Sequence, residues 1–132
     1  MEETAVELKL LGAAIVVGLV QLLWAAAAAR SQQDLKWAAG PRDTPMPIKG
    51  TAARLERAFW NFMETFPFFA AAVLAVVVMG KTDALTFWGA VVYVVARAVY
   101  VPLYASGVRG VRTLAWAVAM GGLAAVLVAL FR

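Results

Sequence analysis

Long apolar stretches alternate with short polar ones along the whole chain. We expect each stretch to form a helix that crosses a bilayer, because about 20 apolar residues in a helix span the roughly 30 Å hydrocarbon core. The expected helices cover residues 6–30, 54–79, 84–104 and 111–131. The pattern predicts an all-α integral membrane protein, a single domain over residues 1–132 built as a bundle of four transmembrane helices. In the last helix, Gly121 and Gly122 are expected to let a neighbouring helix approach closely.

The segments around the first helix bear on its extent. Its start is acidic and its apolar run is long, whereas a signal peptide has a basic start and a shorter apolar core, so we expect a retained transmembrane helix. Residues 31–53 form a polar connection to the second helix. Prolines and glycines exclude a continuous helix through it: Gly40, Pro41, Pro45, Pro47 and Gly50. We expect residues 31–39 to prolong the first helix into water.

Basic residues are unevenly divided between the two ends of the expected bundle. The first and third loops carry Arg30, Lys36, Arg42, Lys49, Arg109 and Arg112, and the other end carries Lys9, Lys81 and Arg132. Cytoplasmic loops of membrane proteins are enriched in lysine and arginine. We therefore expect the first and third loops in the cytoplasm and both termini on the opposite side.

Composition agrees with a membrane protein and removes several kinds of chemistry. The chain is 64% hydrophobic, against roughly 45–50% apolar residues in a soluble domain. It has no cysteine and no histidine, which excludes disulfides, thiolate metal sites and a Ser-His-Asp triad, so no metal site is expected. The net charge is +4, but the basic residues lie in short loops beside apolar runs, so no nucleic-acid partner is expected.

A polar stripe crosses the first half of the second helix. Its members fall within about 80° on a helical wheel: Arg54, Arg57, Asn61 and Glu64. Glu64 lies about 15 Å along the axis, where an ionisable group costs about 2.5–3.5 kcal/mol unless it is paired or faces water. We therefore expect Glu64 to lie within salt-bridge or water-bridged reach of an arginine, with Arg97 or Arg57 as the best candidates. Such a stripe indicates a functional site, and the alternative is a polar seam between helices.

Polar residues also share one face near the end of the third helix. Tyr93, Arg97, Tyr100 and Tyr104 lie within about 60° of one another. This set and the stripe of the second helix belong to the same side of the membrane, so the two can meet at one depth. Arginines outnumber carboxylates there, which favours an anionic ligand held by guanidinium groups. The tyrosines would supply phenol donors or anchor the helix at the membrane interface.

Two sequence blocks resemble the MAPEG family, the membrane-associated proteins in eicosanoid and glutathione metabolism. The first block, ERAFWNFMETFPFF, has an arginine, an asparagine four residues later, a glutamate three after that, and then a proline. The second block, ARAVYVPLYASGVRGVRTLAW, has an arginine, aromatic residues three and seven positions later, and a basic loop. The blocks stand in the family's order, and the resemblance covers essentially the whole chain.

The resemblance implies a homotrimer of four-helix protomers, with a site between neighbouring subunits near the cytoplasmic side. Family enzymes bind glutathione, ionise its thiol beside an arginine, and attack a lipophilic electrophile that arrives from the lipid bilayer. Carried over by motif, Arg112 would be catalytic, because a cation beside the sulfur favours the thiolate of a thiol whose pKa is about 9. The residues that would hold glutathione are Arg57, Asn61, Glu64, Arg97, Tyr100, Tyr104 and Arg30.

The expected function is that of a glutathione-dependent membrane transferase or peroxidase acting on lipophilic electrophiles. The alternative is a non-catalytic lipid- or anion-binding membrane protein of the same fold, since some family members bind lipid without catalysis. Trp60 stands where some glutathione-using members have a second arginine, which weakens the grip on an anion. A third hypothesis is a small transporter with Glu64 as its proton site. It is disfavoured because the lone glutamate of such exporters lacks the surrounding arginines and asparagine.

Overall fold

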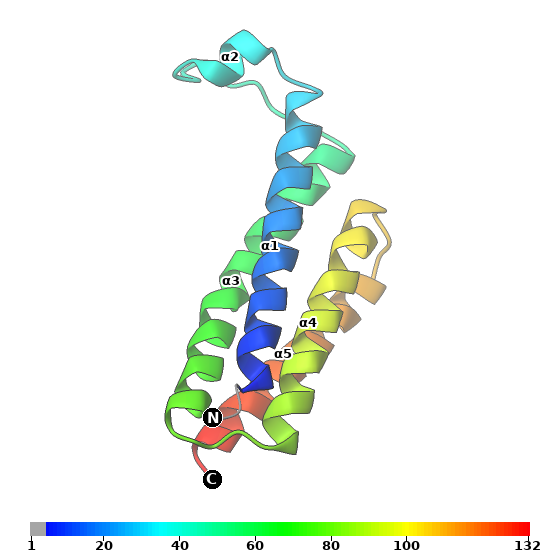
Figure 1. Ribbon diagram of the computed structural model, residues 1–132. Coiled ribbons are helices and arrows are strands. Elements are labelled where there is room, and N and C mark those ends of the chain that lie inside the picture. Colours follow the sequence, from blue (N-terminus) through cyan, green and yellow to red (C-terminus); the bar gives the residue numbers. More distant parts are fainter. Residues whose placement is uncertain (1–4) are drawn as a thin grey trace.

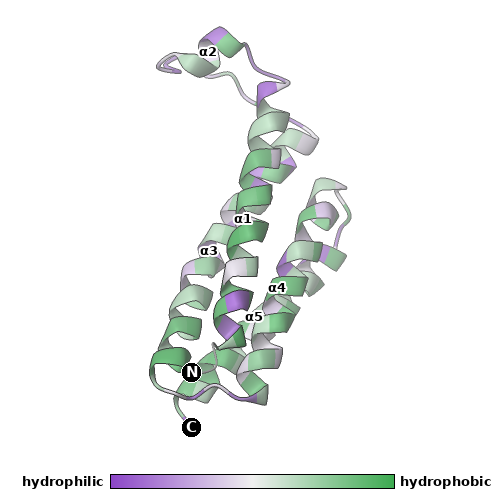
Figure 2. Cartoon of the chain, in the orientation of Figure 1, coloured by the Kyte–Doolittle hydropathy of each residue, from purple (hydrophilic) through white to green (hydrophobic). Residues whose placement is uncertain are grey.

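Four long helices and one short helix make up the protein, shown here by a computed structural model that describes residues 5–132. In chain order they are α1 (Val6–Arg30), α2 (Leu35–Ala39), α3 (Thr51–Val78), α4 (Ala84–Ala105) and α5 (Val111–Leu130). The four long helices are long and apolar enough to cross a membrane, whereas α2 lies beyond the end of the bundle (Figure 1). Figure 2 shows apolar residues along the long helices and hydrophilic residues gathered in and around α2. The prediction of an all-α, multi-pass integral membrane protein is confirmed.

The bundle has two distinct ends. Helix α1 begins and α5 ends at one of them, which we call the terminal end (Figure 1). Helix α2 and the connection at residues 106–110 lie at the other, which we call the α2 end. Helix α3 begins at Thr51, three residues before its expected start at residue 54. The preceding Gly50 has a backbone φ of +66°, which glycine adopts without strain, and the chain turns into the helix there.

The connection between α1 and α3 folds back on itself. The prediction that residues 31–39 prolong α1 is wrong, because α1 ends at Arg30. Asp34 starts the separate helix α2, since its carboxylate accepts a hydrogen bond of 2.9 Å from a backbone N–H in the first turn. The side chain of Gln32 donates to the carbonyl oxygen of Lys49 at 2.8 Å and accepts from its N–H at 2.9 Å. A prolonged α1 would carry Gln32 away from this partner.

Glycines allow the closest contact between helices. A Cβ atom at Gly122 of α5 would lie 2.8 Å from the backbone nitrogen of Tyr93 in α4. A Cβ atom at Gly89 of α4 would lie 2.7 Å from the carbonyl oxygen of Gly122. The expected close approach at Gly122 is therefore confirmed. Gly121 is exposed and has no neighbouring atom within 4 Å of the same position, so it makes no such contact within the chain.

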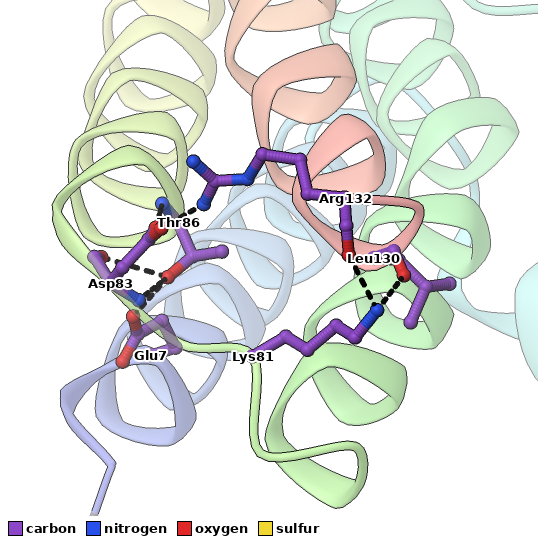
Figure 3. Close-up of polar contacts among 6 residues, drawn as sticks. All are labelled: Glu7, Lys81, Asp83, Thr86, Leu130 and Arg132. Atoms are coloured by element: carbon purple, nitrogen blue, oxygen red, sulfur yellow. Dashed lines mark hydrogen bonds and ion pairs between the residues drawn. The ribbon is translucent and has the colours of Figure 1, made fainter.

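Polar contacts close the terminal end of the bundle (Figure 3). Asp83 and Thr86 form a capping box at the start of α4, and the Thr86 hydroxyl donates to the buried carboxylate of Glu7 in α1 at 2.6 Å. The ammonium group of Lys81 donates to two carbonyl oxygens at the end of α5, at 2.8 and 3.1 Å. Arg132 forms an ion pair with Asp83. The turn between α3 and α4 thereby joins the first helix to the last.

Candidate functional site

A series of polar contacts joins α3 to α4, and we call it the α3–α4 ladder. From the α2 end inward, its contacts are Arg54 Nε to the Ala105 carbonyl oxygen (2.9 Å), Arg57 Nε to the Tyr104 hydroxyl (3.2 Å), Arg97 Nη1 to Asn61 Oδ1 (2.9 Å), and the Thr65 and Tyr93 hydroxyls (2.9 Å). Residue numbers rise on one helix as they fall on the other, because a short turn makes the two helices antiparallel. The polar stripes expected on the two helices therefore face each other.

The ladder gives way to an apolar contact toward the terminal end. The ring of Tyr93 stacks on that of Phe69 in α3, with ring centroids 4.0 Å apart, and both side chains belong to the buried core. The Tyr93 hydroxyl meets Thr65 on the other side. Tyr93 thus marks the boundary between the polar half and the apolar half of the α3–α4 contact.

A cleft of about 270 Å³ lies beside the ladder, between α3, α4 and α5. The residues that line it are Asn61, Tyr100, Tyr104, Arg112, Thr113 and Trp116. Four of them, Asn61, Tyr100, Tyr104 and Arg112, are among the site residues predicted from the sequence. The structure therefore brings together, in one cleft, polar groups from the two predicted stripes and from the start of α5.

Two arginines approach the ring of Tyr104, which is half-buried between them. The guanidinium carbon of Arg112 lies 4.3 Å from the ring centroid, and that of Arg57 lies 5.9 Å from it. Arg57 also donates to the Tyr104 hydroxyl. A cation over an aromatic face is attracted by about 0.5–1 kcal/mol at exposed sites and more when desolvated. The phenol ring thereby holds the charge of Arg112 at the cleft, where an anionic group would meet it, and a second charge, that of Arg57, nearby.

Arg97 lies behind the cleft and does not line it. It has 0% of its surface exposed, and its guanidinium carbon stands 4.2 Å from the centroid of the Tyr100 ring. Its Nε and Nη2 atoms have no hydrogen-bond partner within residues 5–132. Within one chain, Arg97 reaches the cleft through its hydrogen bond to Asn61, and its contact with a ligand stays a prediction.

Glu64 forms no salt bridge within residues 5–132, and a contact bridged by water stays a prediction. Glu64 is exposed, and the ion pair found within residues 5–132 joins Arg132 to Asp83 at the terminal end. The physical reason lies in the line along which α3 meets α4. That line passes through Asn61 and Thr65, so Glu64, three residues on from Asn61, is turned about 60° to the outside.

Arg30 lies in a different place from the other predicted residues. It donates to the side chain of Gln33, and it lines a second cleft of about 320 Å³ together with Arg42, Glu56 and Trp60. A separate apolar groove of about 250 Å³ lies between α1 and α3 and shares the lining residues Leu22 and Phe59 with this cleft. Within one chain, Arg30 is therefore not part of the cleft that contains Arg112.

Three side chains of the ladder and the cleft belong neither to the predicted polar stripes nor to the predicted site residues. Thr113 and Trp116 line the cleft beside Arg112, and Thr65 extends the ladder below Asn61. Helical spacing would have indicated two of them, because Trp116 and Thr65 each follow a predicted residue by four positions and so share its face. Thr113, next to Arg112 in sequence, has no such signal.

The lining groups can donate hydrogen bonds and carry positive charge. They comprise a guanidinium group, an amide, three hydroxyls and an indole, and none of the six lining side chains is a carboxylate. Such a set binds an anion or acceptor oxygens and stabilises developing negative charge. It offers neither of the usual general bases, a carboxylate or an imidazole, to remove a proton from a ligand.

No curated protein and no solved structure gives a significant match. A model of the MAPEG family matches residues 10–132, a range that contains the whole α3–α4 ladder and every residue of the cleft. The chain therefore belongs to the MAPEG family, the membrane proteins of eicosanoid and glutathione metabolism.

Proposed function

We propose that the protein is a glutathione-dependent membrane transferase or peroxidase that acts on lipophilic electrophiles. The observation that carries the proposal is the cleft itself, where Arg112 stands beside amide and hydroxyl donors. Glutathione presents two carboxylates and two amides, which suit cations and donors. Its thiol, with a pKa of about 9, needs a neighbouring cation more than a base to ionise near neutral pH.

The residues divide into those that hold the peptide and one that acts on the sulfur. Arg57 and Asn61 hold charged ends and amides of glutathione, and Tyr100 and Tyr104 flank it. Arg112 faces the sulfur and stabilises the thiolate, while the thiol proton passes to water. The thiolate then forms a sulfur–carbon bond with the electrophile, and the leaving group departs with the bonding electrons.

The proposal includes a homotrimer with the α2 end in the cytoplasm. Glu64 is exposed near the middle of the 28-residue helix α3, and an unpaired carboxylate facing lipid there would cost about 2.5–3.5 kcal/mol. A neighbouring subunit that covers this face removes the cost. In such a trimer, Arg30 of one subunit contributes to the cleft of the next. The loops at the α2 end are rich in lysine and arginine, which favours the cytoplasm as the location of this end.

The second candidate is a non-catalytic protein that binds an anionic lipid, and the cleft around Arg30 favours it. Arg30 and Arg42 bring positive charge to this cleft, Trp60 is 59% exposed there, and the apolar groove shares Leu22 and Phe59 with it. An anionic headgroup would meet the arginines and an acyl chain would follow the groove. This binding mode requires neither Arg112 nor thiolate formation.

Purified protein in detergent distinguishes the two candidates. Glutathione is added at neutral pH, the thiolate is followed by its ultraviolet absorbance, and conjugation of a generic aryl halide is measured. The proposed enzyme is expected to show both signals, and Arg112→Ala is expected to lose both. Arg109→Ala, which removes an exposed cation three residues away, is the matched control and is expected to keep them. Wild-type protein that shows neither thiolate nor conjugation would favour the lipid binder.

A further inference from the structure

The contact between Asn61 and Arg97 joins the cleft to the buried interior of the bundle. Asn61 is half-buried and lines the cleft, whereas Arg97 is fully buried and does not. We infer that Arg97 is a positioning residue, which holds the Asn61 carboxamide so that its NH2 group faces the cleft and selects a carboxylate or carbonyl oxygen of the ligand. The choice of glutathione as that ligand rests on the proposed function, whereas the orientation of the amide does not.

The hydrogen bond decides which end of the amide meets Arg97. Nη1 of Arg97 lies 2.9 Å from the side-chain oxygen of Asn61. A guanidinium group has donors and no acceptor, so the amide nitrogen cannot occupy this place. Within residues 5–132 the amide nitrogen is not among the buried atoms that lack a partner, although it donates no hydrogen bond. It is therefore accessible and free to donate its two N–H groups to a ligand.

Aromatic packing holds the Arg97 guanidinium in place. Its carbon lies 4.2 Å from the ring centroid of Tyr100 and 5.7 Å from that of Phe62. A guanidinium group placed against an aromatic ring is restricted in its rotation, because it is planar and the contact is short. Tyr100 also lines the cleft. The same ring thus separates Arg97 from the cleft and fixes the direction of its bond to Asn61.

Arg97 also places a positive charge behind the cleft. Its Nε and Nη2 lack partners, and no ion pair joins it to a carboxylate within the described residues. A cation bonded to the amide oxygen draws electron density from the amide and strengthens the opposite N–H donors. A negatively charged acceptor gains most from this arrangement, so a carboxylate is the preferred group at this point of the cleft.

The substitution Asn61→Asp separates the structural contact from the selection of the ligand. An aspartate accepts the bond from Arg97 and pairs with its charge, so the melting temperature is expected not to fall. It presents an acceptor to the cleft in place of two donors. Glutathione affinity is then expected to fall by about tenfold or more, because two acceptors would face each other. If Asn61→Asp bound glutathione as tightly as the wild type does, the inference that the Asn61 NH2 group selects the ligand would be wrong.

Asn61 is the only asparagine in the chain, so an isotope label on asparagine reports on it alone. Protein made with asparagine carrying nitrogen-15 in the side-chain amide gives one NH2 signal pair by NMR, without any ligand. We expect Arg97→Met, which removes the donor, to shift this pair. Arg97→Lys, which keeps the charge but loses the planar geometry, is expected to shift it less and serves as the folded variant should Arg97→Met not fold. Arg109→Met is the control and leaves the pair unchanged.

An NH2 pair that is unchanged in the folded Arg97 variants would overturn the inference. Titration with glutathione tests the proposed function separately. The wild-type pair is expected to shift on adding glutathione, and Arg97→Lys is expected to need several times more ligand for the same shift. If the Arg97 variants move the pair and glutathione does not, the proposed function fails while the positioning role of Arg97 stands.

Discussion

Arg112 and Arg57 both contact Tyr104 and carry the same charge, but their surroundings differ. Arg112 lines the cleft and lies closer to the Tyr104 ring, whereas Arg57 is exposed and donates to the Tyr104 hydroxyl. In the proposed enzyme, Arg112 acts where charge develops on the sulfur. Arg57 holds a part of glutathione that does not react. Substitutions at the two positions should therefore affect different kinetic constants.

Arg112→Ala is expected to reduce thiolate formation and turnover much more than glutathione affinity. If the substitution raises the pKa of the bound thiol by one unit, the change corresponds to about 1.4 kcal/mol. At a pH well below that pKa, it leaves roughly tenfold less thiolate. Arg57→Ala is expected to do the reverse and chiefly raise the apparent glutathione constant, since uniform binding contributes to KM. Ultraviolet absorbance of the thiolate and steady-state kinetics measure the two effects. Equal changes in both variants would contradict this division.

A second residue-scale prediction concerns the buried carboxylate of Glu7, which accepts a hydrogen bond from Thr86. Thr86→Val leaves Glu7 without this donor and also removes the hydroxyl that accepts from Asp83 in the capping box, so the free energy of unfolding is expected to fall by about 1–3 kcal/mol. Thr82→Val alters an exposed threonine in the same turn and is expected to change stability by less than about 0.5 kcal/mol. Thermal unfolding in detergent compares the two. Equal melting temperatures would show that the contact contributes nothing.

At the scale of the helices, the contact between α4 and α5 depends on a pair of glycines. Gly122→Leu would drive a side chain into the backbone of α4, and overpacking of this kind costs about 1–3 kcal/mol. Gly121→Leu is the matched control, because this neighbouring glycine is exposed and has free space around it. We expect a lower melting temperature for the first variant alone. A loss confined to the second would mean that Gly121 meets a neighbouring subunit.

The helices themselves follow from the sequence, but their mutual rotation does not. Apolar length predicts α1, α3, α4 and α5, and helical spacing predicts which polar residues of α4 share a face. A stripe about 80° wide does not reveal which of its edges meets a neighbouring helix, so the sequence does not show that Glu64 is exposed within one chain. Helix α2 was missed for another reason. Its start depends on Asp34 and on contacts of Gln32 with a residue 17 positions away.

The residues of the candidate site could likewise be predicted only in part from the sequence. Residues on the two facing stripes, such as Asn61 and Tyr100, were found because their spacing places them together. Burial depends on neighbours that spacing does not describe, so the covering of Arg97 by Tyr100 and Phe62 could not be predicted from the sequence. Thr113 was missed because a single threonine beside an arginine carries no pattern.

At the scale of the whole molecule, the charges on the outside of α3 support the proposed trimer. Glu64→Ala removes an exposed carboxylate that would contact a neighbouring subunit, and the trimer is expected to dissociate more readily. Glu56→Ala, which removes an exposed carboxylate near the start of the same helix, is the control and is expected to leave assembly unchanged. Native mass spectrometry in a mild detergent measures the subunit number. Wild-type protein found as monomers alone would contradict the trimer.

The hydrogen bond between Arg97 and Asn61 also has a consequence for biosynthesis. During translation α3 emerges before α4, and only the short turn at residues 79–83 separates them. Helix α4 alone would carry an unpartnered arginine into the bilayer, at a cost of about 2.5–3.5 kcal/mol on insertion scales. Asn61 lowers that cost only while α3 stays beside the entering helix. The two helices should therefore leave the translocation channel for the lipid as one hairpin, with α3 retained at the channel until α4 arrives.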